Sequence, residues 1–452
     1  MIARVVARTS LDRLLPRGAI LLAVLTFGGY AMGLVRDRIF ARTFGAGTEL
    51  DAYNAAFVLP ELALDVLVAG GLAAPFVPIF LGLREGGAGD RAAHEFGQTI
   101  LTLAVLVMAV ASAVLFLLAP VTVGVIAPGF QTTAERDLYT GLFRVMCVTP
   151  VLFAASIALG EVLVADRRFL FYGLAPLLYN GGIVVGTVVL AGRLGIYAAA
   201  LGAVLGALLH LGIRVAGVGR TRFRIRPRLA IGTPAVREFI VLMIPKMASH
   251  PVDPLTFLYF TALATRFGAG GVSAVSFARN FQSVPVSLIG VSIAIATFPV
   301  LSASFAAGDR PAFARTLATN LATTAALTVA AAIGLFALSR VVIAVLLGGG
   351  AFDAEDVALT GGLLAAFALS IPLESLTQLL ARAFYATHNT LIPVSASVAG
   401  LVVIVLAGEW LAPSLGITAI PIAFTAGSLA KVVLLGLLVR SRIQAIGVSP
   451  PR

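Results

Sequence analysis

Long apolar stretches decide what this sequence can fold into. The 452-residue chain is 59% hydrophobic and only 12% charged, with a mean hydropathy of +1.02. Soluble domains average about 45–50% apolar and about 25% charged residues. So much apolar surface needs lipid as its solvent. Unpaired backbone groups are excluded from hydrocarbon, and the runs lack the alternation of a barrel. We therefore expect an all-α, polytopic membrane protein.

About twelve transmembrane helices are predicted. They fall at 19–41, 52–83, 97–119, 138–165, 169–191, 195–217, 238–264, 271–303, 315–348, 357–385, 389–411 and 415–440. The second, eighth and ninth of these exceed the ~20 residues that a crossing needs. We expect those three to tilt, break or continue along the surface.

Arginines gather in the loops on one side of the predicted spans. The densest run, RTRFRIRPR (220–228), lies on that side, whereas the opposite loops carry acids such as Asp353 and Glu355. Basic loops stay in the cytoplasm, so both termini are expected there, in the inner membrane of a bacterium. The run either docks to anionic lipid headgroups or is an ordinary cytoplasmic loop. The net charge of +11 therefore requires no nucleic-acid partner.

The two halves of the chain resemble each other. RTFGAG (42–47) recurs as TRFGAG (265–270), and Pro150 recurs as Pro372, with an offset near 220 residues. Six spans per half give a parallel repeat. We predict an N-terminal six-helix lobe, a basic cytoplasmic linker and a C-terminal six-helix lobe, at 1–218, 219–237 and 238–452. Two such lobes suit alternating access to a central cavity; a static duplicated bundle is the alternative.

Charged side chains inside the predicted spans are candidates for a cavity lining. Each costs about 2.5–3.5 kcal/mol at a helix centre on the insertion scale, and such groups usually face water or a partner. Several of them sit near span ends, where they could extend toward the headgroups. The candidates for substrate binding are Arg36, Asp37, Asp51, Glu61, Arg144 and Arg279.

A proline-rich stretch, IPKMASHPVDP (244–254), is a candidate cation site. It combines Lys246, His250 and Asp253 with three prolines, which break the backbone ladder and free carbonyl groups. Carbonyls beside a carboxylate suit Na⁺ or H⁺ as a coupling ion. The alternative is a kinked helix with a Lys–Asp pair.

Pairs of glycines four residues apart predict close helix packing. Gly182 and Gly186 form one pair, and Gly202 and Gly206 form the other. Glycine lets two membrane helices approach until their backbones touch. We therefore expect these two neighbouring spans to pack tightly.

Signatures of enzymes and metal centres are missing from the sequence. It has no phosphate-binding loop of the Walker type, no nucleophile elbow and no His-Glu-x-x-His. The single cysteine, Cys147, lies in an apolar run and is expected to be a small buried hydrophobe. Neither a catalytic activity nor a cofactor is expected.

Four motifs together point to a known family. The most specific is GLVRDRIFARTFGAGTELDAYNAAFVLPEL (33–62); the others are VIAPGF (125–130), SFARNFQSVPVSLIGVSIAIATFPVLS (276–302) and RAFYATHNTLIPV (382–394). They resemble motifs of the MviN/MurJ lipid II flippases of the MOP exporter superfamily. The resemblance covers nearly the whole chain. It implies a V-shaped bundle of two lobes, as in MATE transporters, and export of an undecaprenyl-diphosphate-linked cell-wall precursor.

The resemblance places only part of the family's cavity residues on this chain. Arg36, Asp37 and Asp51 match family positions. Three arginine positions of the family fall on Tyr30, Leu64 and Asn280, and Arg279 lies one residue before the third. One residue is about 100° of helix rotation, so Arg279 need not point the same way.

Lipid II flipping is therefore the expected function, with a monomer favoured. The partners would be an anionic lipid-linked oligosaccharide and membrane lipids. A diphosphate binds best to paired arginines, so the missing ones leave two alternatives open. One is another cation-coupled exporter of the superfamily, for drugs or polysaccharide units. The other is a degenerate member that does not transport.

Overall fold

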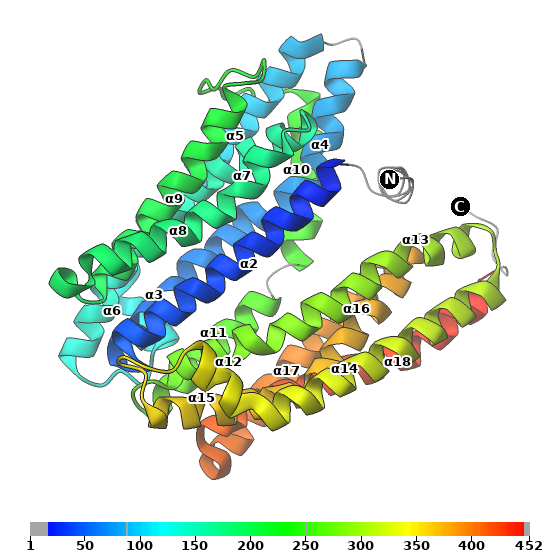
Figure 1. Cartoon of the computed structure of the whole chain (residues 1–452). Helices are drawn as coiled ribbons and strands as arrows, with labels where there is room; N and C mark the ends of the chain where they lie inside the picture. The colour runs from blue at the N-terminus through cyan, green and yellow to red at the C-terminus, as the bar shows by residue number, and fades with distance from the viewer. Residues whose placement is uncertain (1–16, 87–88, 250–251, 447–452) are drawn as a thin grey trace, which may run out of the picture. The chain divides into compact units, whose positions relative to one another are not determined.

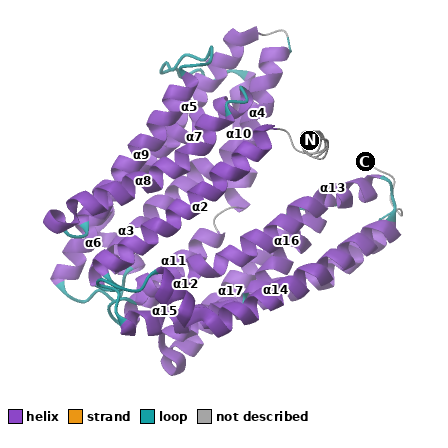
Figure 2. Cartoon of the chain, viewed as in Figure 1, coloured by secondary structure: helices purple, strands orange, loops and turns teal. Residues whose placement is uncertain are grey.

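The computed structural model describes residues 17–86, 89–249 and 252–446 (Figure 1). Within these ranges the regular structure is helical (Figure 2), apart from an isolated bridge between Gly349 and Phe352. The prediction of an all-α chain is confirmed. The described residues form two compact units, the first within Met1–Phe44 and Ala52–Leu255, the second within Gly45–Asp51 and Thr256–Arg452.

The first unit contains most of the helices before residue 255. They are α2 (Arg17–Phe44), α3 (Thr48–Leu64), the π-helix η1 (Asp65–Ala69), α4 (Gly70–Glu85), α5 (Gly89–Ile126), α6 (Thr133–Met146), α7 (Thr149–Ala165), α8 (Phe169–Leu194), α9 (Tyr197–Val218) and α10 (Pro234–Ser249). The first turn of α3 belongs to the second unit, and α11 (Val252–Ala264) belongs to both.

The second unit contains the remaining helices. They are the short 3₁₀-helix η2 (Thr265–Phe267), α12 (Gly271–Pro285), the π-helix η3 (Val286–Val291), α13 (Ser292–Ala306), α14 (Arg310–Leu346), α15 (Ala354–Ala368), α16 (Ile371–Ala386), α17 (Leu391–Leu415), the 3₁₀-helix η4 (Gly416–Thr418) and α18 (Ala419–Ala445).

The order of elements repeats from the first unit to the second. A helix interrupted by a π-helix (α3–η1–α4, then α12–η3–α13) precedes one long helix (α5, then α14), a broken pair and two more long helices. Even rare backbone conformations recur near the predicted offset: Arg167 and His388 are the two non-glycine residues with positive φ, 56° in each, among the described residues. The duplication seen in the sequence is thus also present in the helices.

Two predicted spans, 138–165 and 357–385, prove to be pairs of helices. The first divides into α6 and α7, and the second into α15 and α16, which meet at a bend of 44°. Pro150 and Pro372 lie in the first turn of α7 and α16. Proline has no N–H to donate to the preceding turn, so it starts a new helix there. By length and hydropathy both segments are still suited to cross a membrane, Thr133–Ala165 as one span and the α15–α16 pair as one bent span.

The three overlong predictions have different outcomes. The spans at 52–83 and 271–303 are interrupted by η1 and η3, whereas α14 runs without a break over 37 residues. By length and hydropathy, eight helices of the described chain are suited to cross a membrane, or nine with the α15–α16 pair. The count of twelve stays a prediction.

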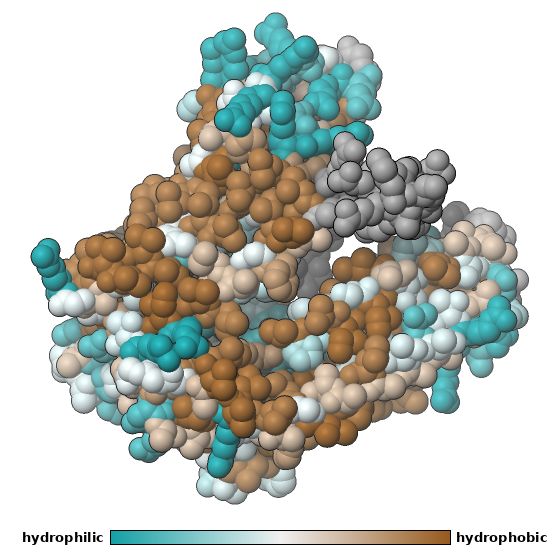
Figure 3. All heavy atoms as spheres, in the orientation of Figure 1, coloured by the Kyte–Doolittle hydropathy of each residue, from teal (hydrophilic) through white to brown (hydrophobic). Residues whose placement is uncertain are grey.

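Aromatic side chains fill the core of the first unit. Phe76, Phe80, Phe96 and Phe239 are buried and contact one another in sequence along α4, α5 and α10. In Figure 3 apolar side chains cover the helices of this unit, and hydrophilic ones gather at the end where α4, α5 and the loop after α9 meet. This distribution suits helices that stand in lipid with a polar loop region at one end.

The glycine pairs pack as predicted. A Cβ atom on Gly182 would overlap the backbone of Gly206, and one on Gly186 would overlap the backbone of Gly202. Helices α8 and α9 therefore touch backbone to backbone, which confirms the sequence interpretation.

The basic segment after α9 lies along α5. Gln98 Nε2 donates to the carbonyl of Arg224 at 2.7 Å, and Arg228 forms a 2.7 Å ion pair with Glu95. The backbone N–H of Arg228 also donates to Thr102 Oγ1 at 3.0 Å. The predicted linker 219–237 thus has hydrogen bonds to the first unit; the domain boundaries themselves stay a prediction.

Candidate functional site

Arg36 on α2 is held by two neighbours. Its Nε and Nη2 atoms donate to Asp37 Oδ1 at 3.0 and 2.8 Å. Nη1 donates to Asn180 Oδ1 on α8 at 3.1 Å. Three of its donors are therefore engaged inside the unit, and its charge is balanced by the mostly buried Asp37 carboxylate.

More polar side chains lie within electrostatic range of Arg36. Tyr53 and Glu61 come from α3, and Tyr179 from α8, while Asp65 acts on Glu61 from the start of η1. Helices α2, α3 and α8 thus assemble one polar cluster, in which Asp37 and Glu61 lie near Arg36 and Asp65 lies near Glu61. Acids outnumber bases here, so this cluster by itself is a poor diphosphate site.

Asp51, at the start of α3, is buried in the second unit. Its Oδ2 accepts from the backbone N–H of Gly270 at 2.7 Å, and Oδ1 accepts from the N–H and Oγ of Ser273 at 2.7 and 2.6 Å. A carboxylate on the first N–H groups of α12 also complements the positive end of the helix dipole. In this structure both oxygens hold a helix in place; a substrate contact for Asp51 stays a prediction.

Arg279 on α12 has a carboxylate partner of its own. Its Nη1 atom pairs with Glu374 Oε2 on α16 at 3.2 Å and donates to Gln282 Oε1. The guanidinium lies over the ring of Phe424 on α18, 4.5 Å from its centroid. Arg279 and Glu374 are partly exposed, at 27% and 14%, so a ligand can reach the pair.

Arg144 differs from the other candidate arginines. It is exposed near the end of α6, with its guanidinium 5.3 Å from the centroid of the Phe116 ring on α5. No acid pairs with it among the residues that the structure describes. Arg36, Arg144 and Arg279 are thus three separate positive groups, of which two are neutralised within their own units.

The predicted cation site is only partly described. Asp253 lies exposed in the first turn of α11, where an acid favours the helix start. His250 and the side chain of Lys246 lie outside the described residues. The helices α10 and α11 end and begin on either side of 250–251, where the prolines predict an interruption. Ion binding here stays a prediction.

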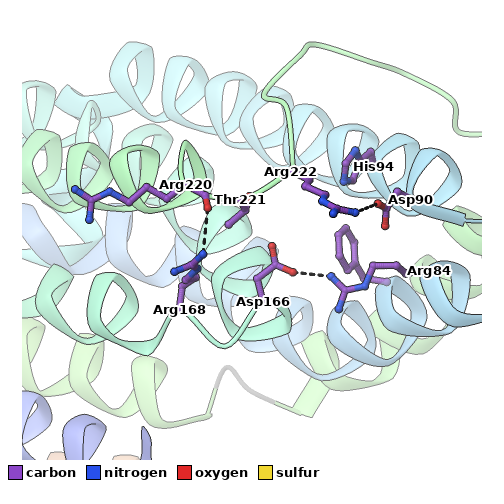
Figure 4. A pocket seen from close by; sticks show the side chains of 9 residues that line it. Arg84, Asp90, His94, Asp166, Arg168, Arg220, Thr221 and Arg222 are labelled. Atoms are coloured by element: carbon purple, nitrogen blue, oxygen red, sulfur yellow. Dashed lines mark hydrogen bonds and ion pairs between the residues drawn. The ribbon is translucent and has the colours of Figure 1, made fainter.

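A pocket of about 610 Å³ lies at the loop end of the first unit (Figure 4). None of the predicted site residues lines it. Its walls come from the end of α4, the start of α5, the α7–α8 turn and the segment after α9: Phe80, Arg84, Asp90, His94, Asp166, Arg168, Arg220, Thr221 and Arg222. Ion pairs join Arg84 to Asp166 at 2.6 Å and Arg222 to Asp90 at 3.5 Å, so the pocket ties these loops together.

Replacing Asp166 with alanine should weaken this end of the unit. The Arg84–Asp166 pair is short but partly exposed, so we expect a loss of about 1 kcal/mol. That corresponds to a thermal midpoint lower by about 1–2 °C in a chain of this size. Asp90→Ala is the control, because the Arg222–Asp90 pair is long and exposed. Equal thermal midpoints for the two variants would show that the Arg84–Asp166 pair does not stabilise this end of the unit.

A buried polar cluster between α7 and α9 was not predicted as a site. Ser156 Oγ lies 2.7 Å from His210 Nδ1, and Arg214 Nη1 donates to the carbonyl of Ser156 at 2.6 Å. The Arg214 guanidinium lies over the ring of Tyr172, and Glu161 is within electrostatic range of it. The available signal was His210 and Arg214 four residues apart in an apolar helix, hence on one face.

Sequence comparison identifies one family. The sequence model described as "Lipid II flippase MurJ" matches residues 40–449. The lipid II flippase MurJ of Burkholderia cenocepacia is 26% identical over 93% of this chain and 84% of its own length. A probable lipid II flippase MurJ of Rickettsia prowazekii is 24% identical over 86% of this chain and 76% of its own.

Solved structures share the fold. A lipid II flippase MurJ in an inward closed conformation aligns with a TM-score of 0.80 at 21% identity, covering 95% of this chain and 90% of that one. An inward-facing multidrug resistance MATE transporter of the MOP superfamily aligns with a TM-score of 0.75 at 13% identity, covering 94% and 96%. At these identities the likeness concerns the fold alone.

Proposed function

Because the chain belongs to the lipid II flippase MurJ family, we propose that it carries lipid II across the cytoplasmic membrane. The observation that carries this proposal is the match of the family's sequence model over residues 40–449. The chain is a multi-pass transporter and not an enzyme. Lipid II, an undecaprenyl-diphosphate-linked peptidoglycan precursor, is the anionic lipid-linked substrate that the family name implies.

The repeated order of helices supports transport by alternating access. Each unit has its own core, and the helix series, the π-helices and the proline breaks recur in both. Parallel repeats of this kind let a transporter move by shifting packed units, with little repacking inside each one. The energy would come from the membrane potential or from an ion gradient, with Na⁺ or H⁺ as the coupling ion.

Arg279 is the residue that we assign to the substrate's diphosphate. It is partly exposed, and Glu374 holds it in the absence of substrate. A diphosphate carries more charge than a carboxylate and offers bidentate acceptors, so it can take the guanidinium from Glu374. The guanidinium of Arg279 lies over the ring of Phe424, and this contact keeps the guanidinium in position during the exchange.

Arg279→Ala should reduce transport by about tenfold or more. Losing a charge-assisted bond costs about 1.5–3 kcal/mol, and 1.4 kcal/mol is a factor of ten. The measurement is flipping of fluorescent lipid II in vesicles that contain the purified protein, together with rescue of cells depleted of their own flippase. Arg266→Ala is the matched control, because its pair with Glu409 lies in the same unit but is more exposed.

Glu374→Gln separates substrate binding from simple structural support. If Arg279 binds the diphosphate, this variant frees the guanidinium and retains or strengthens lipid II binding. If the Arg279–Glu374 pair only stabilises the helices, both variants lose transport and thermal stability together. Wild-type flipping by Arg279→Ala would overturn the assignment, and lack of flipping by the wild-type chain would overturn the proposed function.

Orientation and assembly complete the proposal. We place both termini in the cytoplasm because the arginine-rich loops favour that side. In this orientation the polar end of the first unit, with the 219–233 segment, faces the cytoplasm. We also expect a monomer, because the proposed transport cycle needs only the two units of one chain.

A further inference from the structure

The first unit also has a groove on helices α5, α6 and α7, which are not the helices that hold the polar cluster around Arg36. Helices α5, α6 and α7 pack together and leave an open groove of about 480 Å³. It is lined by Ser112, Ala113, Phe116, Leu117, Arg144, Cys147, Val148, Val151 and Leu152. We call this the α5–α7 groove. Its lining is almost entirely apolar, and Leu117 is 75% exposed at its edge, so hydrocarbon covers it in a membrane.

Arg144 is the only charged residue of the groove lining. Its guanidinium contacts the Phe116 ring, but no hydrogen bond or ion pair joins it to any side chain in the described part of the protein. An arginine inside a membrane span usually has an anionic partner or a wet cavity, because its charge is costly in hydrocarbon. Here the protein provides the aromatic face and leaves the guanidinium edge, with its donors, for a ligand.

A buried hydroxyl points to the same place. Ser112 is 5% exposed, and its Oγ atom has no hydrogen-bond partner among the described residues. A buried polar atom without a partner is rare in a folded protein and calls for an explanation. A bound molecule with polar atoms would supply one.

The position of Arg144 along α6 suits a lipid headgroup. Helix α6 begins at an exposed capping box formed by Thr132 and Glu135, and its first large apolar residue is Leu138. Arg144 follows six residues later, about 9 Å further along the helix axis. At that depth an arginine side chain extends toward the phosphate level of the nearer leaflet.

We propose that the α5–α7 groove binds an anionic phospholipid, its phosphate on Arg144 and one acyl chain against Phe116, Val148 and Leu152. The phosphate accepts from the free edge of the guanidinium while the ring of Phe116 supports its face. The apolar lining of the groove packs against the acyl chain of the lipid. This lipid is a partner of the first unit and is distinct from the transported substrate.

Native mass spectrometry of the purified full-length protein tests this proposal. Phosphatidylglycerol and phosphatidylcholine with the same acyl chains serve as probes. The wild type should retain one phosphatidylglycerol in preference to phosphatidylcholine, and Arg144→Gln should weaken that binding about tenfold. Arg136→Gln is the matched control, since Arg136 lies on the same helix and donates to the carbonyl of Phe130 outside the groove.

A second variant tests the groove while Arg144 and its charge stay unchanged. Ala113 is exposed and lines the groove, so Ala113→Trp should fill it without disturbing the core. It should also lose the bound lipid. Equal retention by the wild type, Arg144→Gln and Ala113→Trp would overturn the proposal. So would displacement of phosphatidylglycerol by undecaprenyl diphosphate, because the groove would then belong to the substrate.

Discussion

Asp51→Ala is expected to destabilise the second unit by about 3–5 kcal/mol. The substitution removes a buried carboxylate that accepts three hydrogen bonds, from the N–H group of Gly270 and from the N–H and hydroxyl groups of Ser273. Gly270 has a φ of +84°, so the chain around it depends on being held in that unusual turn. Thermal unfolding and limited proteolysis of the purified protein measure the effect.

Three further variants test whether the loss of stability follows the number of hydrogen bonds removed at Asp51. Asp51→Asn keeps one acceptor oxygen and should lose less stability than Asp51→Ala. Ser273→Ala removes only one of the three hydrogen bonds and should also lose less stability. Glu49→Ala, in the same turn but exposed, should leave stability unchanged. If Asp51→Ala unfolds like the wild type and loses only transport, then the carboxylate serves the substrate, as the family resemblance implies, and the structural assignment fails.

Gly186→Leu is expected to prevent the first unit from forming its tight α8–α9 contact. Even a single Cβ atom at this position would overlap the backbone of Gly202, and backbone has no rotamer by which to move aside. The helices must separate, and the whole facing row of small residues then loses contact. We expect a loss of several kcal/mol, at the upper end for a single substitution, visible as poor yield and aggregation.

A glycine on the open side of the same helix controls for this prediction. A Cβ atom on Gly192 would meet nothing within 4 Å, so Gly192→Leu should express and unfold as the wild type does. Size-exclusion chromatography and thermal unfolding compare the two variants. If Gly186→Leu is as well folded as Gly192→Leu, then the close contact of α8 with α9 does not support the unit.

Part of the candidate site followed from sequence alone. Arg36 and Asp37 were predicted as cavity residues because charges in an apolar helix face water or a partner; the structure pairs them with each other, and substrate binding stays a prediction. The second hydrogen-bond partner of Arg36, Asn180, is 144 residues away, and nothing in the sequence marked it as a partner. The same holds for Arg279: its charge was visible, but its pairing with Glu374 on α16 was not.

The interruptions of the helices were also predicted only in part. Proline at 150 and 372 was visible as a repeated residue, yet apolar residues such as Val148 and Leu369 continue across the breaks, so α6–α7 and α15–α16 were each placed in one predicted span. The π-helices η1 and η3 were unpredicted for a different reason. A π-helix needs one extra residue per turn, and packing against neighbouring helices decides whether that residue is accommodated.

By itself the sequence indicated lipid as the solvent, the helical class and the duplication, because hydropathy and repeated motifs can be read from the order of residues without any contact in space. It also determined the α8–α9 contact, because glycine spacing acts locally. Only the tertiary structure decided which charges are neutralised. Asp51 meets Gly270 and Ser273, Arg279 meets Glu374, and Arg144 meets an aromatic ring but no acid. Such pairings join helices that are distant in the chain, and the energy of a charge depends on what surrounds it in space.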